Sequence, residues 1–263
     1  MSGRFADLRT RLLSAAVMIA LGLGALLAGG YWFLALVSVL AGLMLWELIR
    51  MLGPQVGQSK SILLAAVGAA SVLRAGVDTS LIALSTLFIA PFIGLVLLQR
   101  DRAVFVIYAF SILVASAALF WLRVQGGLDW PLWLVLVVIA SDVGGYFFGR
   151  IIGGPKILPR ISPKKTWSGT LGGWLLAALV GLGFAQLRGF GASIVVMSVL
   201  TAIAAQAGDV AESAVKRHVG VKDASALIPG HGGVLDRFDA MIGASLFVLL
   251  WLAMFGAPAA GAY

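Results

Sequence analysis

The sequence contains no cysteine and few charged residues, and both absences limit what the protein can be. Without cysteine there is no disulfide framework and no thiol-based catalysis or metal binding. Only 11% of the 263 residues are charged, whereas 61% are hydrophobic and the mean hydropathy is +1.04; a soluble domain has roughly 25% charged residues. These values exclude a soluble enzyme, a disordered chain and a nucleic-acid-binding module. They predict an all-α, polytopic integral membrane protein, since the apolar residues form continuous blocks and do not alternate as in a membrane β-barrel.

Eight apolar blocks are long enough to cross a bilayer, which takes about 20 residues of helix. The predicted spans are 11–29, 31–51, 79–98, 103–123, 130–149, 168–187, 190–208 and 238–256. A ninth block, 61–73, has only 13 residues and could be a span or a re-entrant or interfacial segment. The first block could also be a cleaved signal peptide, but its length favours a span.

The distribution of basic residues decides between eight and nine spans, because lysine and arginine gather on the cytoplasmic side. With nine spans and a cytoplasmic N-terminus, 16 of the 19 basic residues face the cytoplasm, and only Arg74, Arg123 and Arg188 face outward. Without the short block, the split becomes eight against 11. We therefore predict about nine transmembrane helices with the C-terminus outside, in a cell membrane and most simply a bacterial inner membrane.

No internal repeat is visible, so residues 1–263 are predicted to form a single membrane domain. Residues 1–128 would supply N-terminal membrane helices. Residues 129–263 would form the catalytic region, because the two long cytoplasmic loops, 150–167 and 209–237, and most of the acidic residues lie there. Any chemistry is thus expected on the cytoplasmic face.

A carboxylate inside the sixth predicted span is the first candidate for chemistry. Asp142 lies in the sequence SDVGGY, about two helical turns before Arg150. A charge in hydrocarbon costs about 3 kcal/mol or more, so it needs a polar cavity or a partner. We expect a site residue; the alternative is a structural carboxylate paired with a basic residue.

The loop 153–169, GGPKILPRISPKKTWSG, combines three prolines with four basic residues. The prolines prevent a continuous helix, and amines beside the start of the next helix suit a phosphate group. We predict that Lys164 and Lys165 bind phosphate. The alternative is a loop that only sets topology and touches anionic lipid headgroups. The loop has no Walker A pattern, which excludes a P-loop.

The stretch 206–239 brings acidic, basic and glycine residues together. If the eighth span continues as a helix, one of its faces carries Asp209, Glu212, Ser213, Lys216 and Arg217. Asp236 and Asp239 lie three residues apart at the start of the ninth span, and the GHGG turn at 230–233 permits positive φ. Two acidic pairs with basic residues between them suit Mg²⁺ and a polyphosphate. The alternative is a solvated loop crossed by ion pairs.

The stretch from Ser213 to Asp239 resembles the signature of CDP-diacylglycerol synthases, also called phosphatidate cytidylyltransferases. That signature reads S-x-φ-K-R-x4-K-D-x-[GSA]-x2-φ-P-x-H-G-G-φ-x-D-R-φ-D, where φ is apolar, and the chain satisfies it throughout. The segments SDVGGYFFGR at 141–150, SPKKTW at 162–167 and GDVAES at 208–213 also resemble family segments, in the family order. The chain departs from the family at Ala224, often serine, and at Ser168, often glutamate or glutamine.

The resemblance implies transfer of CMP from CTP to phosphatidic acid, which gives CDP-diacylglycerol and pyrophosphate for phospholipid synthesis. It implies Mg²⁺ held chiefly by Asp209 and Asp236 with help from Glu212 and Asp239, in a di-metal arrangement whose second cation the sequence does not identify. Lys216, Arg217 and Asp142 would share the catalytic site with these carboxylates. The residues expected to bind substrate are Lys164, Lys165, Ser213, Lys222, His231, Gly232, Gly233 and Arg237. The expected partners are CTP, phosphatidic acid and the bilayer, with no nucleic acid, and a homodimer is left open.

Three other functions are compatible with parts of the sequence. A CTP-dependent lipid kinase has similar needs but would release CDP in place of pyrophosphate. A secondary transporter would also explain Asp142 in mid-span, but it is expected to have two similar halves. A CDP-alcohol phosphotransferase is disfavoured, because its motif begins with Asp-Gly and this dipeptide is absent from the chain.

Overall fold

The computed structural model describes residues 2–257, with side chains from residue 9 onward, and is dominated by helices. Eight of the described helices are long and apolar enough to cross a membrane, so the predicted all-α, polytopic fold is confirmed. The C-terminal Tyr263, predicted to lie outside the cell, and the side chain of Arg4 fall outside the described residues. The chain divides into two compact units: unit 1 comprises Met1–Gln125 and His218–Phe238, and unit 2 comprises Gly126–Arg217 and Asp239–Tyr263. One membrane domain over 1–263 remains a prediction.

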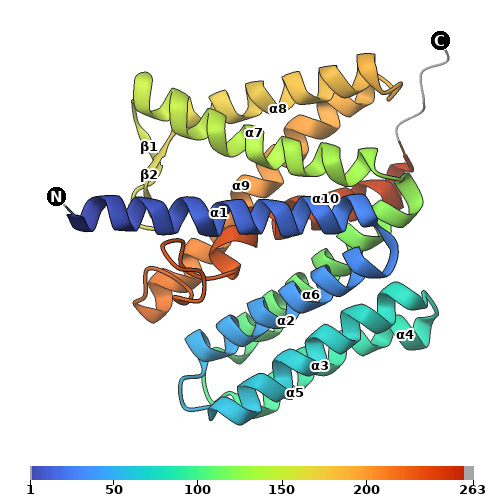
Figure 1. The fold of residues 1–263 in the computed structure, drawn as a ribbon, viewed down its shortest axis with the longest axis vertical. Coiled ribbons are helices and arrows are strands. Elements are labelled where there is room, and N and C mark those ends of the chain that lie inside the picture. Colours follow the sequence, from blue (N-terminus) through green and yellow to red (C-terminus); the bar gives the residue numbers. More distant parts are fainter. Residues whose placement is uncertain (1, 258–263) are drawn as a thin grey trace. The chain divides into compact units, whose positions relative to one another are not determined.

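Unit 1 is built from five longer helices and two short ones. They are α1 (Ser2–Ala28), α2 (Gly30–Leu52), α3 (Gln58–Val77), α4 (Leu81–Ser85), the 3-10 helix η1 (Thr86–Phe88), α5 (Ile89–Leu97) and α6 (Arg102–Gly126). Figure 1 shows α2, α3, α5 and α6 side by side. Gly68 of α3 faces Leu45 of α2 and Leu113 of α6, both fully buried. The core of unit 1 therefore lies where α2, α3 and α6 meet.

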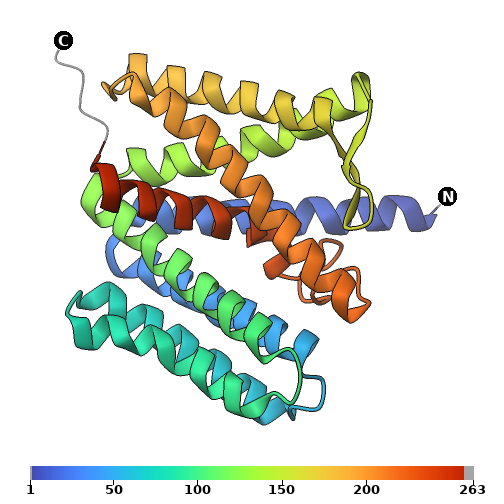
Figure 2. The ribbon, with the colours of Figure 1, turned by 180° about the vertical axis from the view of Figure 1, so that it is seen from behind.

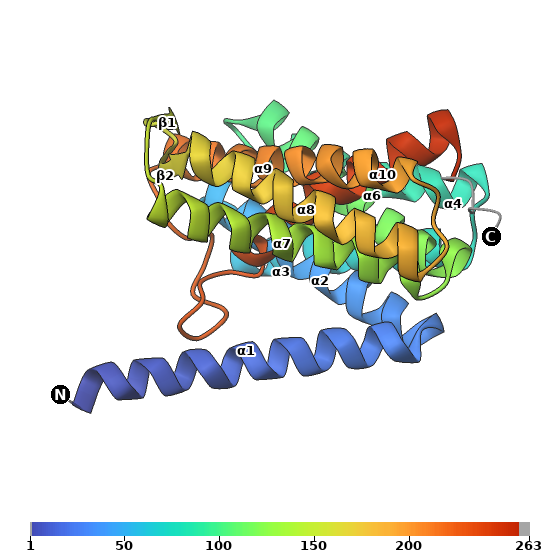
Figure 3. The ribbon, with the colours of Figure 1, turned by 90° about the horizontal axis from the view of Figure 1, so that it is seen from above.

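Helix α1 stands apart from α2 along most of its length, as Figure 3 shows. Its large apolar side chains are exposed at successive positions, among them Leu12, Val17, Leu21 and Leu27. A helix with apolar residues on its uncovered faces suits contact with lipid acyl chains. Its composition therefore agrees with a membrane span that the protein itself barely covers.

The short block 61–73 belongs to a full-length helix. Helix α3 has 20 residues, because Gln58, Ser59 and Lys60 form its first turn outside the apolar block. A contact elsewhere in unit 1 agrees with counting it as a span: Arg123 Nε donates to the carbonyl of Leu26 at 3.1 Å. Nine spans put both residues on the outer side, whereas omitting α3 would put them on opposite sides. The orientation itself remains a prediction.

The predicted span 79–98 is broken into α4, η1 and α5, which together cover Leu81–Leu97. Pro91 accounts for the break, because proline has no N–H to donate to residue 87 and its ring clashes with that carbonyl. Pro91 lies in the first turn of α5, where this loss costs little. The segment is apolar but shorter than the eight long helices, so the structure differs here from the single helix that was predicted.

Unit 2 consists of four long helices and a small hairpin. Its elements are α7 (Asp129–Ile151), β1 (Lys156–Leu158), β2 (Ser162–Thr166), α8 (Trp167–Leu187), α9 (Ser193–Val219) and most of α10 (Leu235–Phe255). Helices α7 and α8 pack closely, since a Cβ atom on Gly144 would lie 2.7 Å from the carbonyl oxygen of Gly172. Trp133 Nε1 donates to Ser198 Oγ at 2.9 Å and joins α7 to α9.

The segment 150–167 was predicted to be a loop in which prolines prevent a continuous helix. It contains an antiparallel hairpin with Lys156 opposite Thr166 and Leu158 opposite Ser162. In Figure 2 this hairpin connects the ends of α7 and α8. Both strands of a two-stranded sheet are edge strands, where proline is tolerated, so prolines that prevent a helix do not prevent the hairpin. Thr166 then caps α8, because its Oγ1 accepts from the Gly169 N–H at 3.2 Å.

Candidate active site

Helix α9 continues as one helix to Val219, 11 residues beyond the predicted end of its span. The prediction that the polar residues after 208 share a helix face is confirmed by two side-chain contacts, each between residues one helical turn apart. Ser213 Oγ donates to Asp209 Oδ1 at 3.4 Å, and Lys216 forms an ion pair with Glu212. Glu212 is fully buried and Lys216 nearly so, whereas Arg217 is exposed.

Lys165 joins these residues from the hairpin. Its Nζ lies 2.6 Å from Asp209 Oδ2 and donates to the carbonyl of Gln206 at 3.2 Å. The neighbouring Lys164 is exposed, because successive side chains of a strand point to opposite faces. The structure therefore separates two lysines that the sequence treated alike. We call Lys165, Gln206, Asp209, Glu212 and Lys216 the α9 cluster.

Gln206, a member of this cluster, links α9 to both α7 and α8. Its Oε1 accepts from Trp174 Nε1 of α8 at 3.1 Å, and its Nε2 donates to Ser141 Oγ of α7 at 3.1 Å. A Cβ atom on Gly173 would lie 2.8 Å from Gln206 Nε2, so glycine is needed there for the amide to fit. Sequence reasoning did not single out Gln206, although an amide inside an apolar helix signals a polar partner.

The predicted acids of unit 2 lie near one another. Asp239 is close enough to Asp209, Lys216 and Asp142 to interact electrostatically with each. Gly208 permits this approach, since a Cβ atom there would lie 2.5 Å from the carbonyl oxygen of Asp239. Asp142 is exposed on α7, and its role as a site residue remains a prediction. The α9 cluster and these acids therefore bring mixed charge together from the hairpin and from helices α7, α9 and α10.

In unit 1, the residues Gly220–Leu235, which we call the signature loop, form a tight turn around His231. The positive φ expected of the GHGG glycines is confirmed at Gly230 (76°) and Gly232 (85°). The N–H of Ile228 donates to the carbonyl of Gly232 at 2.8 Å, and His231 N–H donates back to Ile228 at 2.9 Å. Arg237 donates through Nε and Nη2 to the carbonyl of His231, at 3.0 and 2.7 Å.

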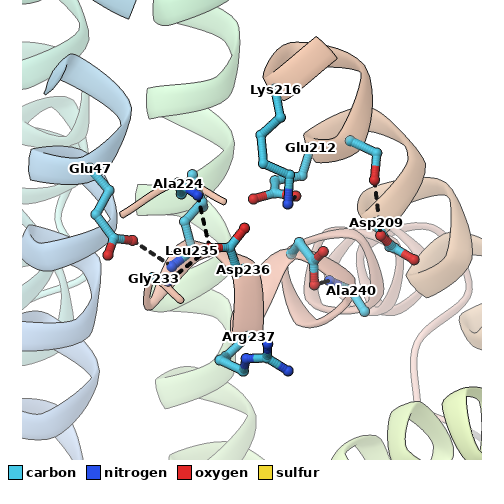
Figure 4. A network of polar contacts seen from close by, with 12 residues as sticks. Glu47, Asp209, Glu212, Lys216, Ala224, Gly233, Leu235, Asp236, Arg237 and Ala240 are labelled. Carbon is cyan, nitrogen blue, oxygen red and sulfur yellow. Dashed lines mark hydrogen bonds and ion pairs between the residues drawn. The ribbon is translucent and has the colours of Figure 1, made fainter. Parts of the chain in front are cut away.

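Asp236 closes the signature loop from the first turn of α10. Its Oδ2 accepts from the backbone N–H of Gly233 at 2.8 Å and of Ala224 at 2.9 Å, as Figure 4 shows. Ala224 contributes a backbone N–H here, so the interaction does not depend on which side chain stands at that position. The departure from the family at Ala224 therefore leaves the contact with Asp236 intact.

Glu47 of α2 holds the same loop and was missed by sequence reasoning. It is fully buried, and its Oε1 accepts from Val234 N–H at 2.9 Å and Ser225 Oγ at 2.5 Å. Its Oε2 accepts from Leu235 N–H at 2.6 Å, a bond drawn in Figure 4. One signal could have found it: Glu47 is the only acidic residue in the first four long helical spans.

Two histidines link the neighbourhood of the signature loop to the rest of unit 1. His231 Nδ1 lies 2.8 Å from Ser14 Oγ on α1, and His218 Nε2 lies 2.9 Å from Asp101 Oδ1 in the connection before α6. The contact with Ser14 gives His231 a structural role, and the predicted binding of substrate by His231 remains a prediction. Lys222 is exposed on the loop.

Among the side chains described, those of residues 9–257, no three histidines, aspartates or glutamates form a ready metal cluster. The predicted ligands divide between the units, with Asp236 in unit 1 and Asp209, Glu212 and Asp239 in unit 2. Mg²⁺ commonly uses one or two carboxylates together with water and substrate phosphates. Carboxylates offer only oxygen ligands, which Mg²⁺ prefers. That these carboxylates bind Mg²⁺ together is a proposal.

Comparison with known proteins places the chain in a family. The model of the cytidylyltransferase family matches residues 9–255. The chain belongs to this family. The resemblance noted in residues 213–239 is thereby confirmed, and the family match also covers the N-terminal helices.

Individual members of the cytidylyltransferase family agree with this assignment. A phosphatidate cytidylyltransferase of Staphylococcus aureus (strain COL) is 33% identical over 250 residues, which is 89% of this chain and 95% of that protein. One of Brucella suis biovar 1 (strain 1330) is 47% identical over 127 residues, 48% of this chain and 47% of that protein. A Brucella abortus biovar 1 (strain 9-941) protein of the same name has the same identity and coverage. The chain thus spans about half the length of the Brucella relatives.

Proposed function

We propose that the protein transfers CMP from CTP to phosphatidic acid. A phosphate oxygen of the lipid attacks the α-phosphorus of CTP, the bond from that phosphorus to the bridging oxygen breaks, and pyrophosphate leaves with the bonding electrons. The products are CDP-diacylglycerol and pyrophosphate. The nucleophile is already anionic, so the reaction does not require a strong protein base.

The observation that carries the proposal is the α9 cluster, in which two carboxylates of helix α9 are each paired with an amine, one from the hairpin and one from α9 itself. The pairs are Lys165 with Asp209 and Lys216 with Glu212. Bringing two polyanions together is the main obstacle of this reaction, and amines reduce it by neutralising phosphate charge. The relatives bear the name of this activity, which favours it over a lipid kinase or a transporter.

The proposed Mg²⁺ site uses Asp209 and Asp236 as principal ligands, with Glu212 and Asp239 assisting. A bound Mg²⁺ ion would supply charge neutralisation and fix the in-line geometry of attack and departure. The support for this assignment is the oxygen chemistry of the four side chains and the short separation of Asp236 and Asp239 along α10. A second cation remains a proposal.

The protein's own cations act on the phosphates of the two substrates. In the free protein, Lys165 is occupied by Asp209, so it must exchange this partner for a phosphate oxygen when substrate binds. Lys164, Arg217 and Lys222 are exposed and are proposed to bind the phosphates of the incoming nucleotide. We propose that five further residues shape the site around the phosphates: the turn residues Gly232 and Gly233, together with Ser213, His231 and Arg237.

We propose that the reaction takes place at the cytoplasmic face of a cell membrane. The 16 basic residues predicted on that side include those of the hairpin and the signature loop. The lipid would approach sideways with its acyl chains in the bilayer, which explains why a reaction between phosphates uses a multi-pass protein. A homodimer remains a prediction.

The position of the transferred label tests this function. Purified protein is incubated with phosphatidic acid, Mg²⁺ and CTP labelled at either the α- or the γ-phosphorus. The proposal predicts that only the α-label enters the lipid, with release of pyrophosphate. Transfer of the γ-label with release of CDP would establish the lipid kinase instead. Incorporation of neither label would leave the transporter as the better account.

A further inference from the structure

We infer that Glu47 of α2 is a positioning residue that sets the first turn of α10 and, through it, the carboxylate of Asp236. All the contacts that carry the inference lie within unit 1. The catalytic meaning of Asp236 rests on the proposed function, whereas the positioning of its carboxylate rests on the geometry alone.

Helix α10 begins without a capping side chain of its own. The first N–H groups of a helix have no partner within the helix and are usually satisfied by a polar residue just before it. Here that residue is Val234, which has no acceptor in its side chain. Glu47 supplies the acceptors instead, because its two oxygens accept from the N–H groups of Val234 and Leu235, which lie 187 and 188 residues further along the chain. A carboxylate also interacts favourably with the N-terminal end of the helix dipole.

Glu47 also controls the two amides that hold Asp236. Those amides belong to Ala224 and Gly233, and each is followed in the chain by a residue bound to Glu47. Ser225 follows Ala224 and donates its hydroxyl to Glu47, while Val234 follows Gly233. One buried carboxylate therefore fixes both sides of the loop that grips Asp236 Oδ2.

Three donors converge on Glu47 in a fully buried position. A carboxylate matches this arrangement, because it accepts hydrogen bonds and donates none. Glutamine has the same shape but would turn an N–H₂ group toward one of the donors. The geometry thus predicts a graded series in which glutamine keeps part of the function and alanine keeps least.

Gly233 shows how closely the loop is fitted to Glu47. A Cβ atom on Gly233 would lie 2.6 Å from Glu47 Oε1, and its three nearest atoms all belong to the Glu47 carboxylate. The φ angle of Gly233 is outside the positive range, so alanine is disfavoured there by Glu47 and not by the backbone. The need for glycine at position 233 therefore depends on the carboxylate of Glu47.

The first experiment compares Glu47→Gln and Glu47→Ala with the wild-type protein, using Ser38→Ala as the control. Ser38 is buried on the same helix, and its hydroxyl finds no hydrogen-bond partner among the described residues. Amide hydrogen exchange of the segment 224–236 and the CMP-transfer kinetics are measured on the same samples. We expect Glu47→Ala to speed exchange and to lower kcat by about tenfold or more, the scale of a lost hydrogen bond to a charged group.

The two readouts separate positioning from other roles. Positioning predicts that kcat falls while KM for CTP changes little, that Glu47→Gln lies between alanine and wild type in both readouts, and that Ser38→Ala changes neither. Unchanged kcat in Glu47→Ala would overturn the inference. So would a loss of kcat with unchanged exchange, because Glu47 would then act on the reaction without moving the loop. If wild-type protein transfers no CMP, the proposed function fails, and the exchange result still decides whether Glu47 orders the loop.

A double substitution tests whether Gly233 and Glu47 depend on each other. Gly233→Ala alone should speed exchange and lower kcat, because the new methyl group displaces the Glu47 carboxylate. Removing that carboxylate makes room, so Glu47→Ala with Gly233→Ala should be little worse than Glu47→Ala alone. If the two losses instead multiply, the residues act independently and the inference is wrong.

Discussion

Replacing Lys165 with alanine removes the amine that lies 2.6 Å from Asp209 Oδ2. The side chains of the pair are 24% and 32% exposed, so water screens their attraction. A pair of this kind contributes roughly 0.2–1 kcal/mol to stability. The bond from Lys165 to the carbonyl of Gln206 adds about 1 kcal/mol. The expected cost to folding is therefore on the order of 1–2 kcal/mol.

The expected cost to catalysis is larger. Removing one positioned donor to charge that develops in a transition state lowers kcat by about 10²–10³-fold, or about 2.7–4 kcal/mol. If Lys165 neutralises a phosphate during CMP transfer, the loss of turnover in Lys165→Ala must exceed what its stability change can explain. Lys60→Ala is the control, because Lys60 is an exposed lysine at the start of α3 and its loss changes the net charge equally.

The assay follows α-labelled CMP entering lipid, with thermal unfolding in detergent measured on the same preparations. We expect Lys165→Ala to remain folded at the assay temperature with kcat reduced about 100-fold, and Lys60→Ala to match wild type. Turnover of Lys165→Ala near that of wild type would refute the reasoning. An equal loss in Lys60→Ala would refute it too, because the effect would then come from total charge.

Three further predictions follow from the spans, the carboxylates and the packing of α9. A reporter enzyme fused after Tyr263 should be active only on the outer side of the membrane, and cytoplasmic activity would contradict the nine-span topology. Chelation with EDTA should abolish CMP transfer and added Mg²⁺ should restore it, whereas turnover that survives chelation would remove the metal from the account. Gly208→Ala should lower the unfolding temperature, since its Cβ would lie 2.5 Å from the Asp239 carbonyl oxygen and overpacking costs about 1–3 kcal/mol. Gly183→Ala, which meets no atom within 4 Å, is its control, and equal effects of the two would contradict the proposed packing.

Hydropathy and charge alone predict most of the helices, because a bilayer-spanning segment must bury its backbone polar groups in a continuous apolar helix. The elements that hydropathy did not predict lie where proline alters the local backbone. Pro91 breaks a segment that hydropathy treats as uniform. The short block 61–73, which the charge distribution counted as a span, lies within the full-length helix α3. The hairpin was missed because its prolines were taken only as evidence against a helix.

The candidate site was predictable only to the extent that its residues lie close together in sequence. The helical spacing of Asp209, Glu212 and Lys216 correctly placed them on one face of α9. The role of Glu47 depends on partners 178 to 188 residues away, which no spacing rule relates to it. The difference between Lys164 and Lys165 follows from a strand that the sequence did not suggest.

Substitution of the carboxylates proposed to bind Mg²⁺ requires a control substitution that removes a negative charge elsewhere in the chain. Asp78 follows α3 in a connection predicted to lie outside the membrane on the outer side. Hydrogen bonds from the backbone and side chain of Ser80, with help from Arg74, hold the pKa of Asp78 below its usual value. Asp78 is therefore ionised at neutral pH, so Asp78→Asn removes a full negative charge far from the proposed chemistry in the sequence.

Turnover of Asp209→Asn and Asp236→Asn tests the central claim most directly. Each substitution keeps the shape of the side chain but removes the charge that a metal ligand supplies, and we expect kcat to fall about 100-fold or more at ordinary Mg²⁺ concentration. A surface ion pair at either position would be worth about 0–1 kcal/mol and would leave turnover nearly intact. The account predicts folded, inactive protein for both substitutions and wild-type turnover for Asp78→Asn. Near-normal CMP transfer by Asp209→Asn or Asp236→Asn would contradict it.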